Sequence, residues 1–126
     1  MMAFPQQLAV VVRNVDRARV SAYADASGDH NPLHLDDTFA AHTPFGRTIA
    51  HGMLILAFIS EMMTLSFGNL WSECGSLRVR FKSPVFVGET VSSFGNLLQD
   101  DGTVGSRQLT YSVGCRNTDG VVVVSG

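Results

Sequence analysis

The segment YADASGDHNPLHLDD, residues 23–37, is dense in carboxylates and imidazoles within an otherwise apolar chain. Asp29 and His34 are five positions apart, and Asn31 and Pro32 between them are typical of a helix start. A carboxylate and an imidazole turned toward one point could hold a water and act as a general base and a general acid. Spacing alone leaves a second interpretation open, in which both side chains are merely solvated.

Helix capping explains several other polar residues of this segment. Gly28 suits the left-handed residue that ends one helix. Asn31 can cap a second helix, and Pro32 suits its first position. We expect Asp36 and Asp37 in the early turns of that second helix, where the helix dipole favours anions. Capping leaves the spaced carboxylate–imidazole pair unexplained.

The segment AHGM, residues 50–53, is a second candidate element at the start of a helix. The first N–H groups of a helix have no partner within it and carry partial positive charge. Gly52 has no side chain, so the carbonyl oxygen of a ligand could approach its N–H. Alternatively, Gly52 allows close packing of helix against sheet, and His51 is a partly buried histidine with a satisfied ring.

Metal binding and nucleophilic catalysis are not predicted. The spacings of the four histidines and nearby aspartates match no established metal-binding motif, so we expect no metal. Ser27, Ser60 and the two cysteines have no activating context for a nucleophile. The residues alone therefore leave two interpretations open, a proton-transfer pair and a merely solvated pair, and no cofactor is expected for either.

Local patterns predict the elements that position these residues. Residues 8–13 are rich in β-branched side chains and favour a buried strand. Asp16 can cap a helix that ends near Gly28. Residues 48–67 are apolar on nearly every side, which predicts a long buried helix. The apolar stretch is short for a membrane span and contains Ser60 and Glu61, so burial in protein is favoured.

Strands are expected after the buried helix. Residues 76–90 alternate, which predicts one face formed by Leu77, Val79 and Phe81 and an opposite cationic face. Two further strands should join at Asp100–Gly102, and Asp-Gly at 119–120 should precede a last strand. The predicted fold class is α+β, with one antiparallel sheet wrapped around a long buried central helix. A sheet of this kind has unprotected edges, which favours a homodimer.

Composition narrows the function classes. The 126 residues predict a single domain over 1–126, and 45% hydrophobic residues indicate a globular chain. The net charge of -2 does not indicate nucleic acid or an anionic membrane as the main partner. Cys74 and Cys115 form no disulfide framework, and the N-terminus has no secretory pattern, so a cytoplasmic location is expected.

The chain resembles the MaoC-like, (R)-specific enoyl-CoA hydratase family of hot-dog-fold proteins. Three motifs carry the resemblance in the family's order: YADASGDHNPLHLDDTFA, TPFGRTIAHGMLILAFIS and LRVRFKSPVFVGET. Together they cover most of residues 23–90. The resemblance implies a single hot-dog domain, a homodimer, and a hydro-lyase that needs no cofactor. It also implies a last strand longer than the one that stops here at Gly126.

The resemblance implies roles for four residues. The family pattern of Asp, any residue, Asn-Pro, an aliphatic residue and His is Asp29 to His34 here. It makes Asp29 and His34 the catalytic pair, Asn31 a positioning residue and Gly52 the oxyanion donor. The implied reaction is (R)-specific hydration of trans-2-enoyl-CoA to (R)-3-hydroxyacyl-CoA. Two alternatives stay open: dehydration of a (3R)-hydroxyacyl group on acyl carrier protein, and a non-catalytic acyl-thioester-binding module.

The remaining candidates concern the binding of an acyl-CoA thioester. The resemblance places a small polar residue, Ser60, near the site. The apolar helix offers neighbours for the acyl chain, namely Met53, Leu54 and Phe58. The CoA phosphates require cations, for which the candidates are Arg47, Arg78, Arg80 and Lys82.

Overall fold

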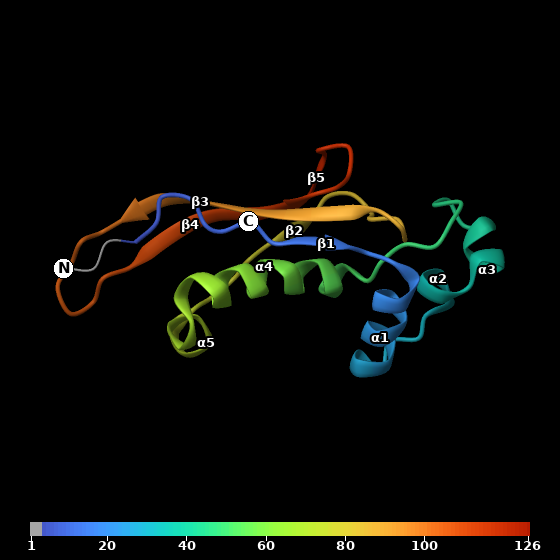
Figure 1. The fold of residues 1–126 in the computed structure, drawn as a ribbon, viewed down its shortest axis with the longest axis horizontal. Coiled ribbons are helices and arrows are strands. Elements are labelled where there is room, and N and C mark those ends of the chain that lie inside the picture. The colour runs from blue at the N-terminus through green and yellow to red at the C-terminus, as the bar shows by residue number, and fades with distance from the viewer. Residues whose placement is uncertain (1–3) are drawn as a thin grey trace.

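The computed structural model describes residues 4–126 as one antiparallel sheet packed on a central helix, as expected (Figure 1). The strand order is β1-β3-β4-β5-β2. The strands are β1 (Val12–Asn14), β2 (Arg80–Phe81), β3 (Thr90–Asp100), β4 (Leu109–Arg116) and β5 (Val122–Ser125). The helices are α1 (Arg17–Ser27), α2 (Pro32–Leu35), α3 (Asp37–Ala41), α4 (Gly52–Phe67) and α5 (Asn69–Cys74).

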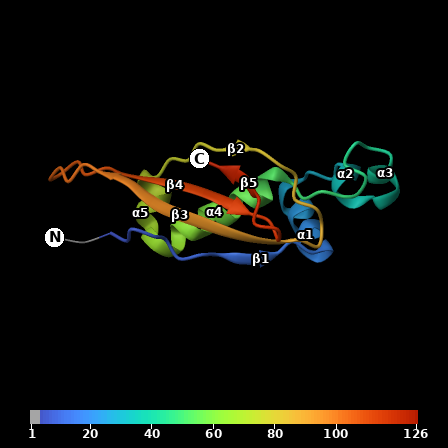
Figure 2. The same cartoon turned by 90° about the horizontal axis from the view of Figure 1, so that it is seen from above.

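Helix α4 lies along the concave face of the sheet and supplies the centre of the core (Figures 1 and 2). Its buried residues follow a helical repeat and form one stripe: Leu54, Ile55, Phe58, Ile59, Met62 and Met63. The predicted burial of this helix is confirmed along the stripe that faces the sheet. Met53 and Leu65 on the uncovered side are 55% and 67% exposed.

The long hairpin β3–β4 forms the middle of the sheet and extends past α5 (Figure 1). The two strands predicted to join at Asp100–Gly102 do form a hairpin, but residues 101–108 make a longer connection than these three residues. Asp101 Oδ1 accepts hydrogen bonds from the N–H groups of Thr103 and Gln108 and so closes this loop. The turn expected at Asp119–Gly120 is present between β4 and β5.

Both edge strands are shorter than predicted. β1 contains Val12–Asn14, not residues 8–13, because the Val11 N–H donates to the Ser93 side-chain oxygen at 2.8 Å, not to a strand carbonyl. β2 is limited to Arg80–Phe81, since the next N–H groups, of Lys82 and Ser83, both donate to the Val123 carbonyl. Phe81 is 53% exposed and does not share a buried face with Leu77 and Val79.

Helices α1 to α3 gather beside the N-terminal end of α4 (Figure 1). The predicted caps of α1 are confirmed: Asp16 accepts from the Arg19 N–H, and Gly28 adopts φ 78° at the C-terminal end. The single helix expected from Asn31 onward is interrupted at Asp36, which has an extended backbone with φ −116° and ψ 105°. Asp36 therefore caps α3 and does not lie in an early turn of α2.

No helix in residues 4–126 is both long and apolar enough to cross a membrane. α4 has 16 residues, fewer than the roughly 20 that a span of the bilayer needs.

Candidate active site

Asp29 lies directly after the glycine that ends α1 and has one carboxylate oxygen held by the backbone. The Gly28 N–H donates to the Ala24 carbonyl, which closes the helix. The Asn31 N–H then donates to Asp29 Oδ1 at 3.2 Å. The other oxygen, Oδ2, faces His34, and the Asp29 side chain is 51% exposed. The local turn thus leaves one oxygen of a solvent-accessible carboxylate available for chemistry.

His34 lies in the single turn of α2 and is anchored from the segment before α4. Its Nδ1 is 2.8 Å from the Ile49 carbonyl oxygen. A carbonyl only accepts, so Nδ1 carries the proton and Nε2 is left to face Asp29. The Ile49 N–H also donates to the Leu33 carbonyl at 3.3 Å. These two contacts join α2 to the start of α4 and fix the direction of the imidazole.

The distance between Asp29 Oδ2 and His34 Nε2 is 3.9 Å. This exceeds hydrogen-bond length, so the two groups do not satisfy each other. One water can bond to both, because it donates to the carboxylate and either donates to the neutral Nε2 or accepts from the protonated one. The structure thus brings together the two residues that the sequence analysis singled out, at a spacing that fits one water.

Asn31 acts on the backbone of the site and not on the ring of His34. Its Oδ1 accepts from the Leu33 N–H at 3.0 Å, which caps α2. Its carbonyl accepts from the His34 N–H at 3.0 Å. Asn31 therefore sets where α2 begins and, through that, the place of His34.

Gly52 is the first residue of α4 and borders the same pocket as Asp29 and His34. The pocket encloses about 270 Å³ and is also lined by Tyr23, Ser27, His51 and Met53. Within residues 4–126 the Gly52 N–H donates no hydrogen bond, as expected at a helix start. An added Cβ would lie 3.1 Å from the Phe81 ring. The glycine thus keeps a free N–H beside the carboxylate–imidazole pair.

A second hollow meets the first at Gly52. It also encloses about 270 Å³, and most of its lining is apolar: Phe45, Ile55, Phe81, Pro84, Val85 and Val124. Gly52 is the residue common to the linings of both hollows. An extended ligand could therefore pass from the polar pocket over Gly52 into apolar surroundings.

His51 is a site residue that the sequence analysis did not select. Its ring stacks on that of His34, with centroids 3.9 Å apart and an angle of 29°. Its Nε2 is 2.9 Å from the Asp29 carbonyl oxygen, whereas its buried Nδ1 has no partner in residues 4–126. The interpretation of a fully satisfied ring was therefore wrong. The only available signal was its position next to Gly52.

Asp29, His34 and His51 each place one potential metal ligand within 4.8 Å of the others. The histidine rings are stacked, so their nitrogen lone pairs run alongside each other and do not converge on one point. His51 Nε2 is also engaged with the Asp29 carbonyl. This arrangement suits hydrogen bonding to a water better than the coordination of a metal ion.

The apolar and small polar candidates are divided between site and core. Met53 lines the pocket with Asp29 and His34. Leu54 and Phe58 point into the core, at 6% and 4% exposure, and line neither of the two hollows that meet at Gly52. Ser60 lies about two turns along α4, where its Oγ accepts from the Trp71 indole N–H at 3.1 Å.

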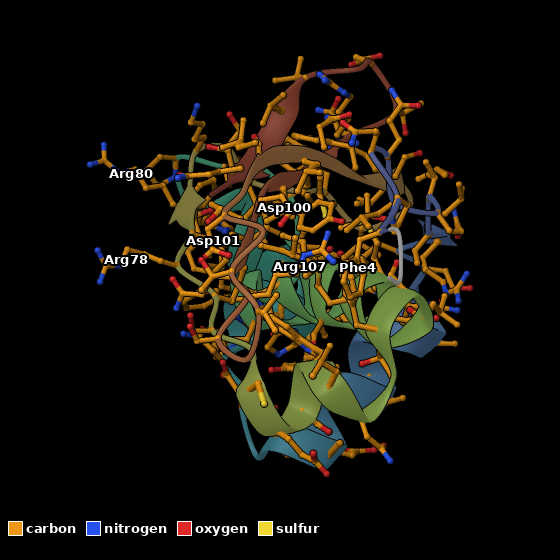
Figure 3. All side chains as sticks on the ribbon, turned by 90° about the vertical axis from the view of Figure 1, so that its left-hand side faces the viewer. Phe4, Arg78, Arg80, Asp100, Asp101 and Arg107 are labelled. Carbon is orange, nitrogen blue, oxygen red and sulfur yellow. The ribbon has the colours of Figure 1, made fainter. Side chains whose placement is uncertain are left out.

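The four candidate cations do not gather at one place. Arg47 lies over the Phe86 ring at 4.0 Å, with Glu89 3.8 Å away. Arg78 and Arg80 extend outward from the protein (Figure 3). Lys82 lines the apolar hollow that borders Gly52. Lys82 is therefore the candidate nearest to a ligand that crosses Gly52.

The sequence is similar to those of several characterised proteins. It is 40% identical over 87 residues to the (R)-specific enoyl-CoA hydratase of Aeromonas caviae, covering 69% of this chain and 65% of the relative. It is 38% identical over 104 residues to the 3-hydroxyacyl-thioester dehydratase Z of Mycobacterium tuberculosis, covering 78% of this chain and 68% of that relative. The chain thus spans about two thirds of the length of these curated relatives.

The fold is also similar to that of a solved structure. The (R)-hydratase from A. caviae involved in PHA biosynthesis superimposes with a TM-score of 0.80 at 31% identity, covering 99% of this chain and 92% of that one. The match confirms the predicted hot-dog fold. The sequence model of the MaoC-like domain matches residues 5–109. The chain therefore belongs to the MaoC-like domain family.

Proposed function

We propose that residues 1–126 act as one catalytic domain that hydrates trans-2-enoyl-CoA to (R)-3-hydroxyacyl-CoA. The observation that carries this proposal is the 3.9 Å separation of Asp29 Oδ2 and His34 Nε2 in a pocket that Gly52 also lines. An (R)-specific enoyl-CoA hydratase and a 3-hydroxybutyryl-CoA dehydratase among the relatives support it, because hydration and dehydration are one reaction run in two directions.

The proposed reaction begins with the water between Asp29 and His34. Asp29 Oδ2 takes a proton from the water as its oxygen forms a bond to C3 and the C2–C3 double bond opens. His34, protonated at Nε2, delivers its proton to C2. The bond from Nδ1 to the Ile49 carbonyl keeps Nε2 aimed at the substrate during this step. Return of a proton from Asp29 to His34 through the next water restores the pair.

Negative charge develops on the thioester oxygen when water adds to C3. We place this oxygen at the Gly52 N–H, where the N-terminal end of α4 adds its dipole. The charge is larger in the transition state than in the substrate, so this interaction lowers the barrier more than it strengthens binding. The stereochemistry of the product follows from the relatives' names and not from the geometry.

The substrate is proposed to be an acyl thioester that lies across Gly52. The apolar hollow beyond Gly52 suits a hydrocarbon or pantetheine segment, and Lys82 at its border suits a phosphate. Acyl carrier protein is the alternative carrier, supported by the name of dehydratase Z, which specifies only a thioester. A non-catalytic thioester-binding module is disfavoured, because capping and packing do not require the water-sized separation of Asp29 and His34.

We further propose that the protein is a cytoplasmic homodimer. β2 forms one edge of the sheet with only two residues, and Arg80 and Phe81 on it are exposed. Pairing of this edge with a second copy would cover it. Free Cys74 and Cys115 suit a reducing compartment. Sedimentation at micromolar concentration is expected to show a dimer, and a monomer would contradict this assembly.

The decisive experiment is to mix the protein with crotonyl-CoA and to follow the loss of enoyl absorbance. We expect turnover by the unmodified protein and a loss of about 100-fold or more in His34→Ala. The matched control is His30→Ala, which removes an exposed imidazole four residues away and should leave turnover unchanged. Activity only with carrier-protein esters would select the alternative carrier. Inactivity with both thioesters would overturn the proposed function.

A further inference from the structure

We propose that His51 is a positioning residue that holds the Asp29 backbone, the His34 ring and the Gly52 N–H in one arrangement. This inference rests on the proposed hydration. His51 contacts two of these groups through its side chain and is bonded to the third through the chain itself. The His51 side chain is itself 3% exposed, although it borders the pocket that holds Asp29 and His34.

The contact with Asp29 is a hydrogen bond to its backbone. His51 Nε2 lies 2.9 Å from the Asp29 carbonyl oxygen, which can only accept, so the ring donates from Nε2. Asp29 follows a helix end and is otherwise exposed. The bond therefore ties the general base to the rigid start of α4, across 22 positions of sequence.

The contact with His34 is a ring stack. The centroids are 3.9 Å apart, and the Tyr23 ring contacts His51 at 4.9 Å. The bond from His34 Nδ1 to the Ile49 carbonyl sets the direction of the imidazole but permits the ring to tilt about that bond. The stack removes this freedom, so His34 Nε2 stays at its distance from Asp29 Oδ2.

The relation to Gly52 is covalent, because the peptide bond between residues 51 and 52 carries the Gly52 N–H. His51 is the N-cap residue of α4, with φ −61° and ψ 134°, and its side chain makes no capping hydrogen bond. N-cap side chains normally bond back to the helix, which makes this position unusual. By bonding to Asp29, the side chain couples the peptide plane at the helix start to the general base.

The unpartnered Nδ1 of His51 separates this role from a purely structural one. A buried nitrogen without a partner costs stability, so an apolar ring of similar shape should be tolerated at least as well by the fold. His51→Phe keeps a stacked ring, removes the unpartnered nitrogen and removes the donor to Asp29.

The test compares three substitutions of His51 by steady-state kinetics with crotonyl-CoA and by thermal unfolding. In His51→Phe we expect kcat to fall about 10- to 100-fold, with KM within about twofold and Tm not lowered. Gln can place its amide N–H where Nε2 is, so His51→Gln should recover part of kcat. Asn is too short to reach the carbonyl, so His51→Asn should not recover it.

The matched control is His42→Phe. His42 also bonds a backbone carbonyl through its ring, to Thr38 at 2.8 Å, but it is exposed and outside the pocket. The kcat of the His42→Phe variant should equal that of the unmodified protein. Unchanged kcat in His51→Phe beside an active unmodified protein would overturn the inference, as would equal kcat in the Gln and Asn variants. Inactivity of the unmodified protein with both thioesters would instead show that the proposed function fails.

Discussion

Two acid–imidazole pairs with the same five-residue spacing occur four residues apart in this chain, and they differ in whether the two groups touch. His30 Nε2 lies 3.0 Å from Asp25 Oδ1, and both side chains are exposed. His34 Nε2 lies 3.9 Å from Asp29 Oδ2, and the His34 side chain is 11% exposed. The first pair is satisfied by its own contact, whereas the second is held apart.

The difference arises from contacts outside each pair. His34 is anchored by the Ile49 carbonyl and by the stacked ring of His51, so it cannot move toward Asp29. The exposed His30 instead contacts its own carboxylate directly, and its hydrogen bond with Asp25 raises the pKa of His30. The role that we propose for Asp29 and His34 thus depends on restraints that keep the two groups apart, because a pair in direct contact has no free position for a water.

The largest expected effect comes from removing one carboxylate from each pair. Asp29→Asn should lower turnover of crotonyl-CoA by roughly 100- to 10,000-fold, because the amide cannot take a proton from the water. Asp25→Asn should leave turnover unchanged. Both variants should keep their circular dichroism spectra, since both side chains are largely exposed. Equal losses in the two variants would show that the pairs do not differ in function.

A smaller effect is expected at Gly52, the oxyanion donor that we propose beside Asp29 and His34. Gly52→Ala places a Cβ 3.1 Å from the Phe81 ring, beside the N–H that the substrate must reach. Turnover should fall about tenfold, while Tm should not fall, because Ala is a better helix former than Gly. Adding Phe81→Ala distinguishes the causes: recovery would attribute the loss to the displaced ring, and no recovery would attribute it to the added methyl group.

A further prediction concerns the network that holds the catalytic segment to its neighbours. The Arg17 guanidinium donates to Asp37 Oδ1 at 2.7 Å and to the Leu35 carbonyl at 3.1 Å, and Asp37 also accepts from the Thr48 hydroxyl. Arg17→Met should lower turnover severalfold, because α2 and the start of α4 lose a common partner. Turnover equal to that of the unmodified protein would show that the His34–Ile49 contact suffices alone.

The same network predicts a pH dependence of stability. The Arg17 hydrogen bond lowers the pKa of Asp37, so this carboxylate stabilises the fold at neutral pH and the contribution is lost as pH falls through the lowered pKa. The Tm difference between unmodified protein and Arg17→Met should therefore shrink in acid. Thermal unfolding between about pH 7 and pH 3 measures this Tm difference. A Tm difference that grows in acid would contradict a stabilising role for ionised Asp37.

The smallest expected effect concerns Asp25 and His30, the pair whose side chains are in direct contact. Because Asp25 raises the pKa of His30, the NMR titration midpoint of His30 should fall toward the ordinary 6.5 in Asp25→Asn. Protonated His30 stabilises the fold fully at a pH below the pKa of the unfolded chain, and this stabilisation is lost as the pH rises above the raised pKa of the folded protein. Any Tm difference between Asp25→Asn and the unmodified protein should therefore vanish in alkali. An unchanged midpoint would show that the contact does not form in solution.

Local signals in the sequence predicted the elements around the site well. Asp16, Gly28 and Asn31 act within a few residues of the helix ends that they define, so their pattern was sufficient. Burial of α4 followed from its composition, and the motif from Asp29 to His34 led to the family and the fold. Predictions failed where the partner was remote, as at Ser93, whose hydroxyl interrupts the first strand at Val11.

The sequence by itself determined the helix caps, the central helix, the family motif and Gly52 at the start of α4. Only the tertiary structure decided which of the two equally spaced acid–imidazole pairs stays open to a water. That decision depends on the Ile49 carbonyl and the His51 ring, which lie 15 and 17 positions beyond His34 in the chain. Spacing along the chain fixes only nearby geometry, whereas the contacts of Ile49 and His51, just before α4, with His34 and Tyr23 bring these restraints to the site.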